Sequence, residues 1–109
     1  MFDIIKERLM LILQHAQTIQ HRMQGISSAD DFINSEAGEV LLDSIITRLQ
    51  ALAENFKKIE KIDPGFTRQH LGIDAAPIIR FRDLAAHHYE SLNHHIIFAI
   101  CRQEIPILI

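Results

Sequence analysis

The chain has few of the features that mark secreted or membrane-embedded proteins. It has a single cysteine, Cys101, so no disulfide can form within the chain. Scarce cysteine is typical of a reducing compartment, and we therefore expect a cytoplasmic protein. No apolar run approaches the roughly 20 residues that a membrane-spanning helix needs, so we expect no membrane partner. Charged residues interrupt the apolar N-terminus, which argues against a signal peptide.

The sequence also lacks the strict apolar–polar alternation of β-strands, and it has no internal repeat or low-complexity segment. Hydrophobic residues make up 48% of the chain and charged residues 23%, which is a globular balance. The length of 109 residues fits one domain spanning residues 1–109. Because a domain of this size buries only a thin core, association with a partner or a second copy would add stability.

Excess positive charge is missing too. The net charge is −3, which argues mildly against a protein that coats nucleic acid non-specifically. Residues 1–65 hold 7 Lys/Arg and 10 Asp/Glu, whereas residues 66–109 hold 4 of each and five of the seven histidines. All four basic residues of the second part are arginines, the side chain that grips phosphate in a fixed geometry. The C-terminal part is therefore where we expect an anion to bind.

Apolar residues spaced three and four apart predict two long helices. The first covers about residues 2–23. The second begins after a Ser35 cap and ends near Lys61, before Asp63-Pro64-Gly65. Between them, Ser28 is expected to cap a short turn that buries Phe32.

Shorter helices follow in the C-terminal part. Asp74 is a good cap for a third helix that ends near Glu90, and Asn93 for a fourth that stops before Pro106. Residues 107–109 would then dock as an extended tail. Thr67 is expected to cap a single turn that ends at Gly72. The pattern as a whole predicts an all-α bundle of two long and two to three shorter helices.

The densest group of reactive side chains lies in the third predicted helix: Arg82, Asp83, His87, His88 and Tyr89. Asp83 and His87 are one turn apart, so the carboxylate can fix one tautomer of the ring and stabilise its protonated form. Arg82 and His87 lie about 140° apart around the helix, so they cannot converge on one atom within it. They could line the two edges of a groove or meet across a symmetric dimer.

This set of side chains suits cleavage of an RNA phosphodiester without a metal. A histidine can take the proton from a 2′-hydroxyl or give one to the leaving oxygen. An arginine can stabilise the charge that develops on the phosphoryl group. On pattern alone, however, a polar stripe on a helix is more often a solvated face.

The paired histidines also raise the question of a metal site. His87-His88 and His94-His95 would lie about 10 Å apart along a continuous helix, too far for one ion to contact both pairs. No cysteine or acidic triad is spaced to complete a site, so we expect neither a metal nor another cofactor. Three further reactive side chains are expected to be structural or superficial: His15 and His21 on the surface, and Cys101 in the core.

The Arg82-x4-His87-x-Tyr89 spacing, followed by Asn93 and a short helix ending at Ile105-Pro106, resembles the C-terminal signature of the HepT-like toxins, members of the HEPN ribonuclease superfamily. The likeness extends over nearly the whole chain. Leu52-Ala53-Glu54-Asn55 resembles the Gly-Glu-Ala stretch of that family. The chain departs from the family pattern at three places: Ile73-Asp74-Ala75 stand where a Pro-Trp pair is common, Asn93 replaces an aspartate, and Ala53 replaces the glycine.

The resemblance implies a HEPN-like homodimer that cleaves RNA, with Arg82 and His87 as the catalytic pair at the interface. It also implies a small nucleotidyltransferase antitoxin as partner, which adenylylates Tyr89. Asp83 and Glu54 would be supporting polar residues. Two alternatives stay open: a non-catalytic subunit that binds a nucleotide or substrate for a two-component nucleotidyltransferase, and a purely structural helical dimer.

Overall fold

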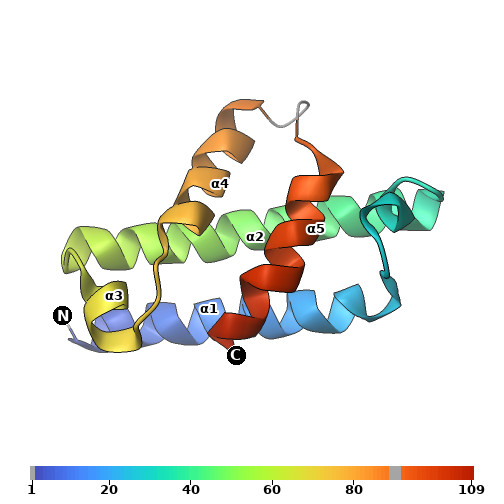
Figure 1. Cartoon of the computed structure of the whole chain (residues 1–109). Coiled ribbons are helices and arrows are strands. Elements are labelled where there is room, and N and C mark those ends of the chain that lie inside the picture. Colours follow the sequence, from blue (N-terminus) through green and yellow to red (C-terminus); the bar gives the residue numbers. More distant parts are fainter. Residues whose placement is uncertain (1, 89–91) are drawn as a thin grey trace.

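The computed structural model describes residues 2–88 and 92–109, with the backbone alone described for Phe2 and residues 86–88. Every regular element in these ranges is helical, which confirms the prediction of an all-α bundle (Figure 1). The elements are α1 (Phe2–Arg22), η1 (Met23–Gly25), η2 (Ala29–Phe32), α2 (Glu36–Ile62), α3 (Phe66–Leu71), α4 (Ala76–His88), α5 (His94–Gln103) and η4 (Ile105–Leu108), where η marks a 3₁₀ turn.

The two long helices α1 and α2 lie side by side and form the body of the domain (Figure 1). α4 packs on α2, and the C-terminal turn η4 packs on α1. The described part of the chain contains no helix long and apolar enough to cross a membrane. The core comes from the predicted apolar seams, and its fully buried side chains include Ile19, Phe32, Ile45, Leu49, Leu52, Phe56 and Ile59.

The turn between the long helices forms as predicted. The Asp31 carboxylate accepts hydrogen bonds from the backbone N–H groups of Ser27 (2.7 Å) and Ser28 (3.1 Å), and Phe32 is fully buried. Ser35 caps α2 by accepting a hydrogen bond from the Gly38 N–H (3.0 Å). At Gly38 the turn passes so close that an added Cβ would lie 2.3 Å from the Asp31 carbonyl oxygen. A glycine is therefore required where α2 meets η2.

The cap of α3 differs from the prediction. Thr67 lies inside the helix and is buried, while Gly65 occupies the N-cap position in the left-handed region (φ 86°). The capping oxygens come from Glu60 at the end of α2, which accepts hydrogen bonds from the Gly65 N–H (2.7 Å) and the Thr67 hydroxyl. Burial acts to raise the pKa of Glu60, but these hydrogen bonds hold it below the ordinary value. The predicted end of the turn at Gly72 is confirmed.

The expected extended tail at residues 107–109 is wrong. The chain turns through η4 instead, which buries Ile105 and leaves Ile107 and Ile109 more than half exposed. Pro106 explains the turn, because its fixed φ suits the first positions of a helix and it needs no N–H partner there. At the start of α5 the predicted cap is confirmed, since the Asn93 side chain accepts a hydrogen bond from the His95 N–H (2.8 Å).

Three isolated reactive side chains were expected to be structural or superficial. Cys101 is buried, and burial raises the pKa of its thiol to about 12, so it packs as a small neutral residue. His21 is exposed, as expected. His15 is not a plain surface residue: it is half-buried, with Nδ1 3.1 Å from Arg48 Nη1. Burial and the Arg48 guanidinium lower the pKa of His15, so the ring is neutral and accepts the arginine N–H.

Candidate active site where α4 packs on α2

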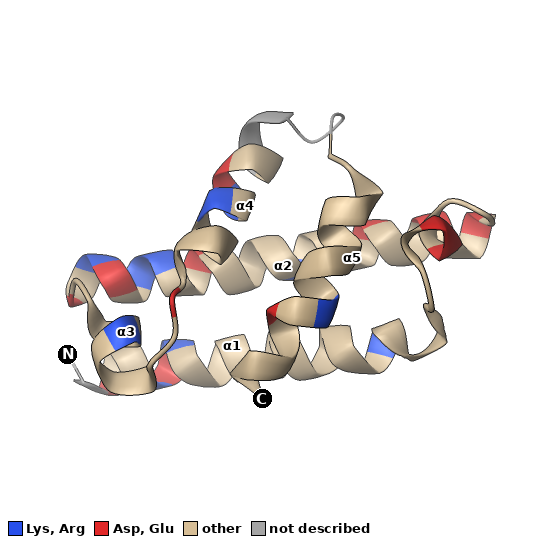
Figure 2. Cartoon of the chain, in the orientation of Figure 1, with Lys and Arg blue, Asp and Glu red and all other residues tan. Residues whose placement is uncertain are grey.

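The apolar seam of α4 fixes the direction of its polar residues. Ile78, Phe81 and Ala85 are spaced three and four apart and are buried, whereas Leu84 is exposed. Arg82 follows Phe81 directly and therefore lies at the edge of the contact with α2. Figure 2 shows basic and acidic residues following one another on this part of α4.

Arg82 reaches across to α2 and contacts Glu54. The distance from Arg82 Nε to Glu54 Oε2 is 2.8 Å, and the two side chains are 31% and 36% exposed. This contact is an ion pair rather than a well-aligned hydrogen bond, because the buried Oε2 makes no hydrogen bond within the described part of the chain. The structure thus brings together two residues that lie 28 positions apart and that sequence reasoning had named separately.

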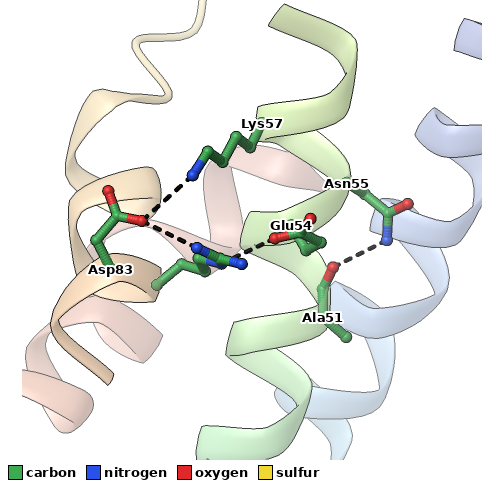
Figure 3. A network of polar contacts seen from close by, with 6 residues as sticks. Ala51, Glu54, Asn55, Lys57 and Asp83 are labelled. Atoms are coloured by element: carbon green, nitrogen blue, oxygen red, sulfur yellow. Dashed lines mark hydrogen bonds and ion pairs between the residues drawn. The ribbon is translucent and has the colours of Figure 1, made fainter. Parts of the chain in front are cut away.

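Asp83, which follows Arg82 on α4, contacts both Arg82 and a lysine of α2. Its Oδ1 lies 3.2 Å from Arg82 Nη1 and 3.5 Å from Lys57 Nζ on α2 (Figure 3). A hydrogen bond from Arg82 and the nearby charge of Lys57 lower the pKa of Asp83, although partial desolvation opposes them. Asp83 is thus ionised at neutral pH. We call Arg82, Glu54, Asp83 and Lys57 the charged cluster; its two cations and two anions balance.

Two of the predicted site residues cannot be placed in this geometry. His87 belongs to α4, one turn after Asp83, but its side chain lies outside the description. Tyr89 lies outside the described residues altogether. Asp83 was expected to orient His87, and this stays a prediction. Among the described side chains, the Oδ1 of Asp83 has two cationic partners, Arg82 and Lys57.

Lys57 is the member of the cluster that sequence reasoning missed. A usable signal existed, because Lys57 is three residues after Glu54 and so lies on the same face of the helix. Only the packing of α4 on that face gives the lysine its partner.

The buried amide of Asn55 anchors the turn of α2 that carries Glu54. Asn55 follows Glu54 and is 7% exposed, and its Nδ2 donates to the Ala51 carbonyl (2.9 Å; Figure 3). Its Oδ1 accepts a hydrogen bond from Arg8 Nη1 on α1 (3.2 Å). Both ends of the amide are therefore satisfied, which fixes this turn of α2 against α1. Glu54 is presented to Arg82 from a rigid helix rather than from a loop.

The arrangement is suited to binding a phosphate through Arg82. A guanidinium has five N–H donors, and the contacts to Glu54 and Asp83 engage Nε and Nη1. A partly exposed, oriented arginine can therefore donate further hydrogen bonds to an anion. The two carboxylates hold the guanidinium in place, but they also lower its attraction for a phosphate.

The fold and this cluster define a small helical bundle that presents an oriented arginine, followed one and a half turns later by a histidine, on one helix. A family model described as "Ribonuclease HepT-like" matches residues 12–109, which include all of α2, α4 and α5. The chain therefore belongs to the HepT-like ribonuclease family, within the HEPN superfamily. Searches of curated proteins and of solved structures found no match.

Proposed function

We propose that this chain is a metal-independent RNA endonuclease and the toxin of a toxin–antitoxin pair. Arg82 binds the scissile phosphate and stabilises the charge of the transition state. His87 transfers protons to and from the reacting oxygens. Membership of a ribonuclease family supports the reaction class. The observation that carries the assignment to this site is the partly exposed Arg82, held by Glu54 across the α2–α4 contact.

The proposed enzyme is a homodimer. Arg82 and His87 are five residues apart on α4, so about 140° of helix separates them and one chain offers only half of a convergent site. A two-fold axis beside α4 would place Arg82 of one protomer opposite His87 of its partner. This arrangement supplies the second half of the site without any bend in the helix.

The proposed antitoxin is a small nucleotidyltransferase that adenylylates Tyr89. Tyr89 is seven residues after Arg82, a spacing that on a continuous helix places both on one face. An attached adenylyl group would bring a bulky anion to the side of the helix from which Arg82 meets the RNA phosphate. The modification would thus block the site both sterically and electrostatically.

The test is expression of the chain alone, followed by measurement of growth and of RNA integrity in lysates that contain EDTA. We expect growth arrest and RNA cleavage, with loss of both in His87→Ala and in Arg82→Ala. A loss of about 10²- to 10³-fold in rate is typical when one transition-state donor is removed. His21→Ala, which removes an exposed histidine of α1, is the matched control and retains activity.

Equal growth and intact RNA with the wild-type chain and with His87→Ala would overturn the proposal. If the folded chain instead co-purifies with a nucleotidyltransferase, without RNase activity and without modification of Tyr89, the result favours a non-catalytic subunit that presents a nucleotide or substrate. Unchanged activity and unchanged partner binding in both site variants would favour a structural dimer.

A further inference from the structure

A second polar cluster lies where η2 meets the first turn of α5. It consists of Asp30 from η2 and His94 and His95 from α5. The Asp30 Oδ1 lies 3.2 Å from His94 Nε2 and 3.9 Å from His95 Nε2. One ligand atom from each of the three residues lies within 4.8 Å of the other two. The two imidazole rings lie against each other, with centroids 4.3 Å apart.

These distances are close to what a tetrahedral metal site needs. Zinc binds imidazole nitrogen and carboxylate oxygen at about 2.0–2.2 Å, which places neighbouring ligand atoms about 3.3 Å apart. The His94–Asp30 distance of 3.2 Å already matches, and the His95–Asp30 distance of 3.9 Å needs a shift of about half an ångström. His95 is 63% exposed, so its ring can make that adjustment without disturbing the core.

The chemistry of the three donors is consistent with the same kind of ion. Two imidazoles and one carboxylate form a ligand set used by zinc in sites that leave a fourth position open. The carboxylate of Asp30 also offsets part of the charge of a divalent cation beside the helix N-terminus, where the helix dipole alone disfavours a cation. The hydrogen bond from the His95 N–H to Asn93 fixes the backbone that carries both rings.

We propose that Asp30, His94 and His95 bind one divalent transition-metal ion of the zinc class. The ion ties the turn between α1 and α2 to the start of α5, two segments 64 residues apart in sequence. Sequence reasoning set His94-His95 against His87-His88 and found no site, because only the fold brings Asp30 to the pair. The site shares no residue with the charged cluster and does not depend on the proposed RNase activity.

The test uses the full chain without an affinity tag, stripped with EDTA and then dialysed free of it. Titration with Zn²⁺ is followed by calorimetry, and Co²⁺ is used as a spectroscopic substitute whose visible absorption reports tetrahedral coordination by nitrogen and oxygen. We expect one Zn²⁺ per chain and a rise in the thermal unfolding midpoint when Zn²⁺ is added. Cys101 is buried as a neutral thiol and does not compete as a ligand.

The variants decide whether these three side chains hold the ion. His95→Ala removes one ligand atom, and Asp30→Asn replaces the carboxylate by a neutral amide, which is a weaker metal ligand. We expect Zn²⁺ binding to weaken by about tenfold or more in each, with loss of the shift in unfolding midpoint. His21→Ala and His87→Ala should bind Zn²⁺ as the wild-type chain does. His95 and Asp30 are more than half exposed, so circular dichroism should show both variants folded.

Absence of stoichiometric Zn²⁺ binding would overturn the proposal and leave the cluster as a hydrogen-bonded link between η2 and α5. Binding that persists undiminished in His95→Ala and Asp30→Asn would do so as well, because other groups must then hold the ion. Loss of binding in His87→Ala would move the ligand set to α4 and would equally contradict the assignment. None of these outcomes alters the result expected from the RNA cleavage assay, because that assay contains EDTA.

Discussion

The helix α2 packs most extensively on α1 and on α4, and its polar contacts with these two helices differ in kind. Toward α1, arginines pair with neutral groups: Arg48 with the neutral ring of His15 and Arg8 with the amide of Asn55. Toward α4, the partners are carboxylates, and Arg82 and Lys57 meet Glu54 and Asp83.

The difference indicates that the α1 side of α2 serves the stability of the fold, whereas the α4 side serves the candidate site. Hydrogen bonds to neutral partners flank a fully buried apolar seam in α2, and the burial of that seam supplies most of the free energy that holds the helices together. Partly exposed ion pairs such as Arg82–Glu54 contribute about 1 kcal/mol or less each and are weakened by salt. What they do provide is an arginine that is oriented, reachable from solvent and able to accept a new anionic partner.

The largest effect is expected from a substitution in the buried apolar seam of α2. Phe56→Ala removes a ring that is 1% exposed, and we expect the free energy of unfolding to fall by about 3–5 kcal/mol. Urea denaturation measures the effect. Val40→Ala on the same helix is the control, because that side chain is 63% exposed and its loss should cost less than about 0.5 kcal/mol.

The same variant tests whether the apolar seam and the charged cluster are independent. Corrected for the folded fraction, RNA cleavage by Phe56→Ala should match that of the wild-type chain, because Glu54 and Arg82 keep their places. Lost cleavage in a sample that circular dichroism shows to be folded would mean that the seam and the charged cluster are not independent.

The next largest effect is expected from Glu54→Gln, which keeps the shape of the side chain and removes its charge. The free energy of unfolding should change by about 1 kcal/mol or less, since the pair is partly exposed. Under the proposed function, kcat should fall by about ten- to a hundredfold, because Arg82 loses its orienting partner. KM should stay the same or fall, since a carboxylate that repels phosphate is gone.

The split between kcat and KM separates positioning from simple loss of structure. Glu39→Gln, an exposed position near the start of α2, is the matched control and should leave both constants unchanged. If Glu54→Gln raises KM and leaves kcat alone, Glu54 serves RNA binding rather than the orientation of Arg82.

The fold was largely predictable because its signals are local. The spacing of apolar residues in α1 and α2 and the capping residues Ser35 and Asn93 act within a few positions, and the structure confirms each of them. The error at the cap of α3 has a non-local cause. Glu60 caps α3 from the preceding helix, so the cap is not visible in the sequence around Thr67.

In the candidate site, too, the local features were predictable and the contacts between helices were not. The reactive side chains along α4 singled out Arg82, Asp83 and His87, and the family resemblance added Glu54. That Glu54 and Lys57 meet these two residues follows from how α4 crosses α2, which no local pattern encodes. Asp30 escaped notice for the same reason, because 64 residues separate it from His94.

The smallest expected effect lies in the titration of Asp83. The Arg82 hydrogen bond is the leading cause that lowers the pKa of this carboxyl, and the Lys57 charge is a weaker one. A carboxyl whose pKa is lower in the folded state stabilises the fold above its unfolded pKa, and that contribution is lost as the pH falls through the folded pKa. Because Asp83 is solvent-exposed, we expect the shift to be visible in NMR titration of its carboxyl carbon and to have little influence on unfolding.

Arg82→Ala should raise the pKa of Asp83 toward its ordinary value, and Lys57→Ala should raise it less. The reverse order would mean that Lys57, rather than Arg82, is the main partner of Asp83, and the contact of Arg82 with Glu54 would then be what sets the α4 side of α2 apart from the α1 side.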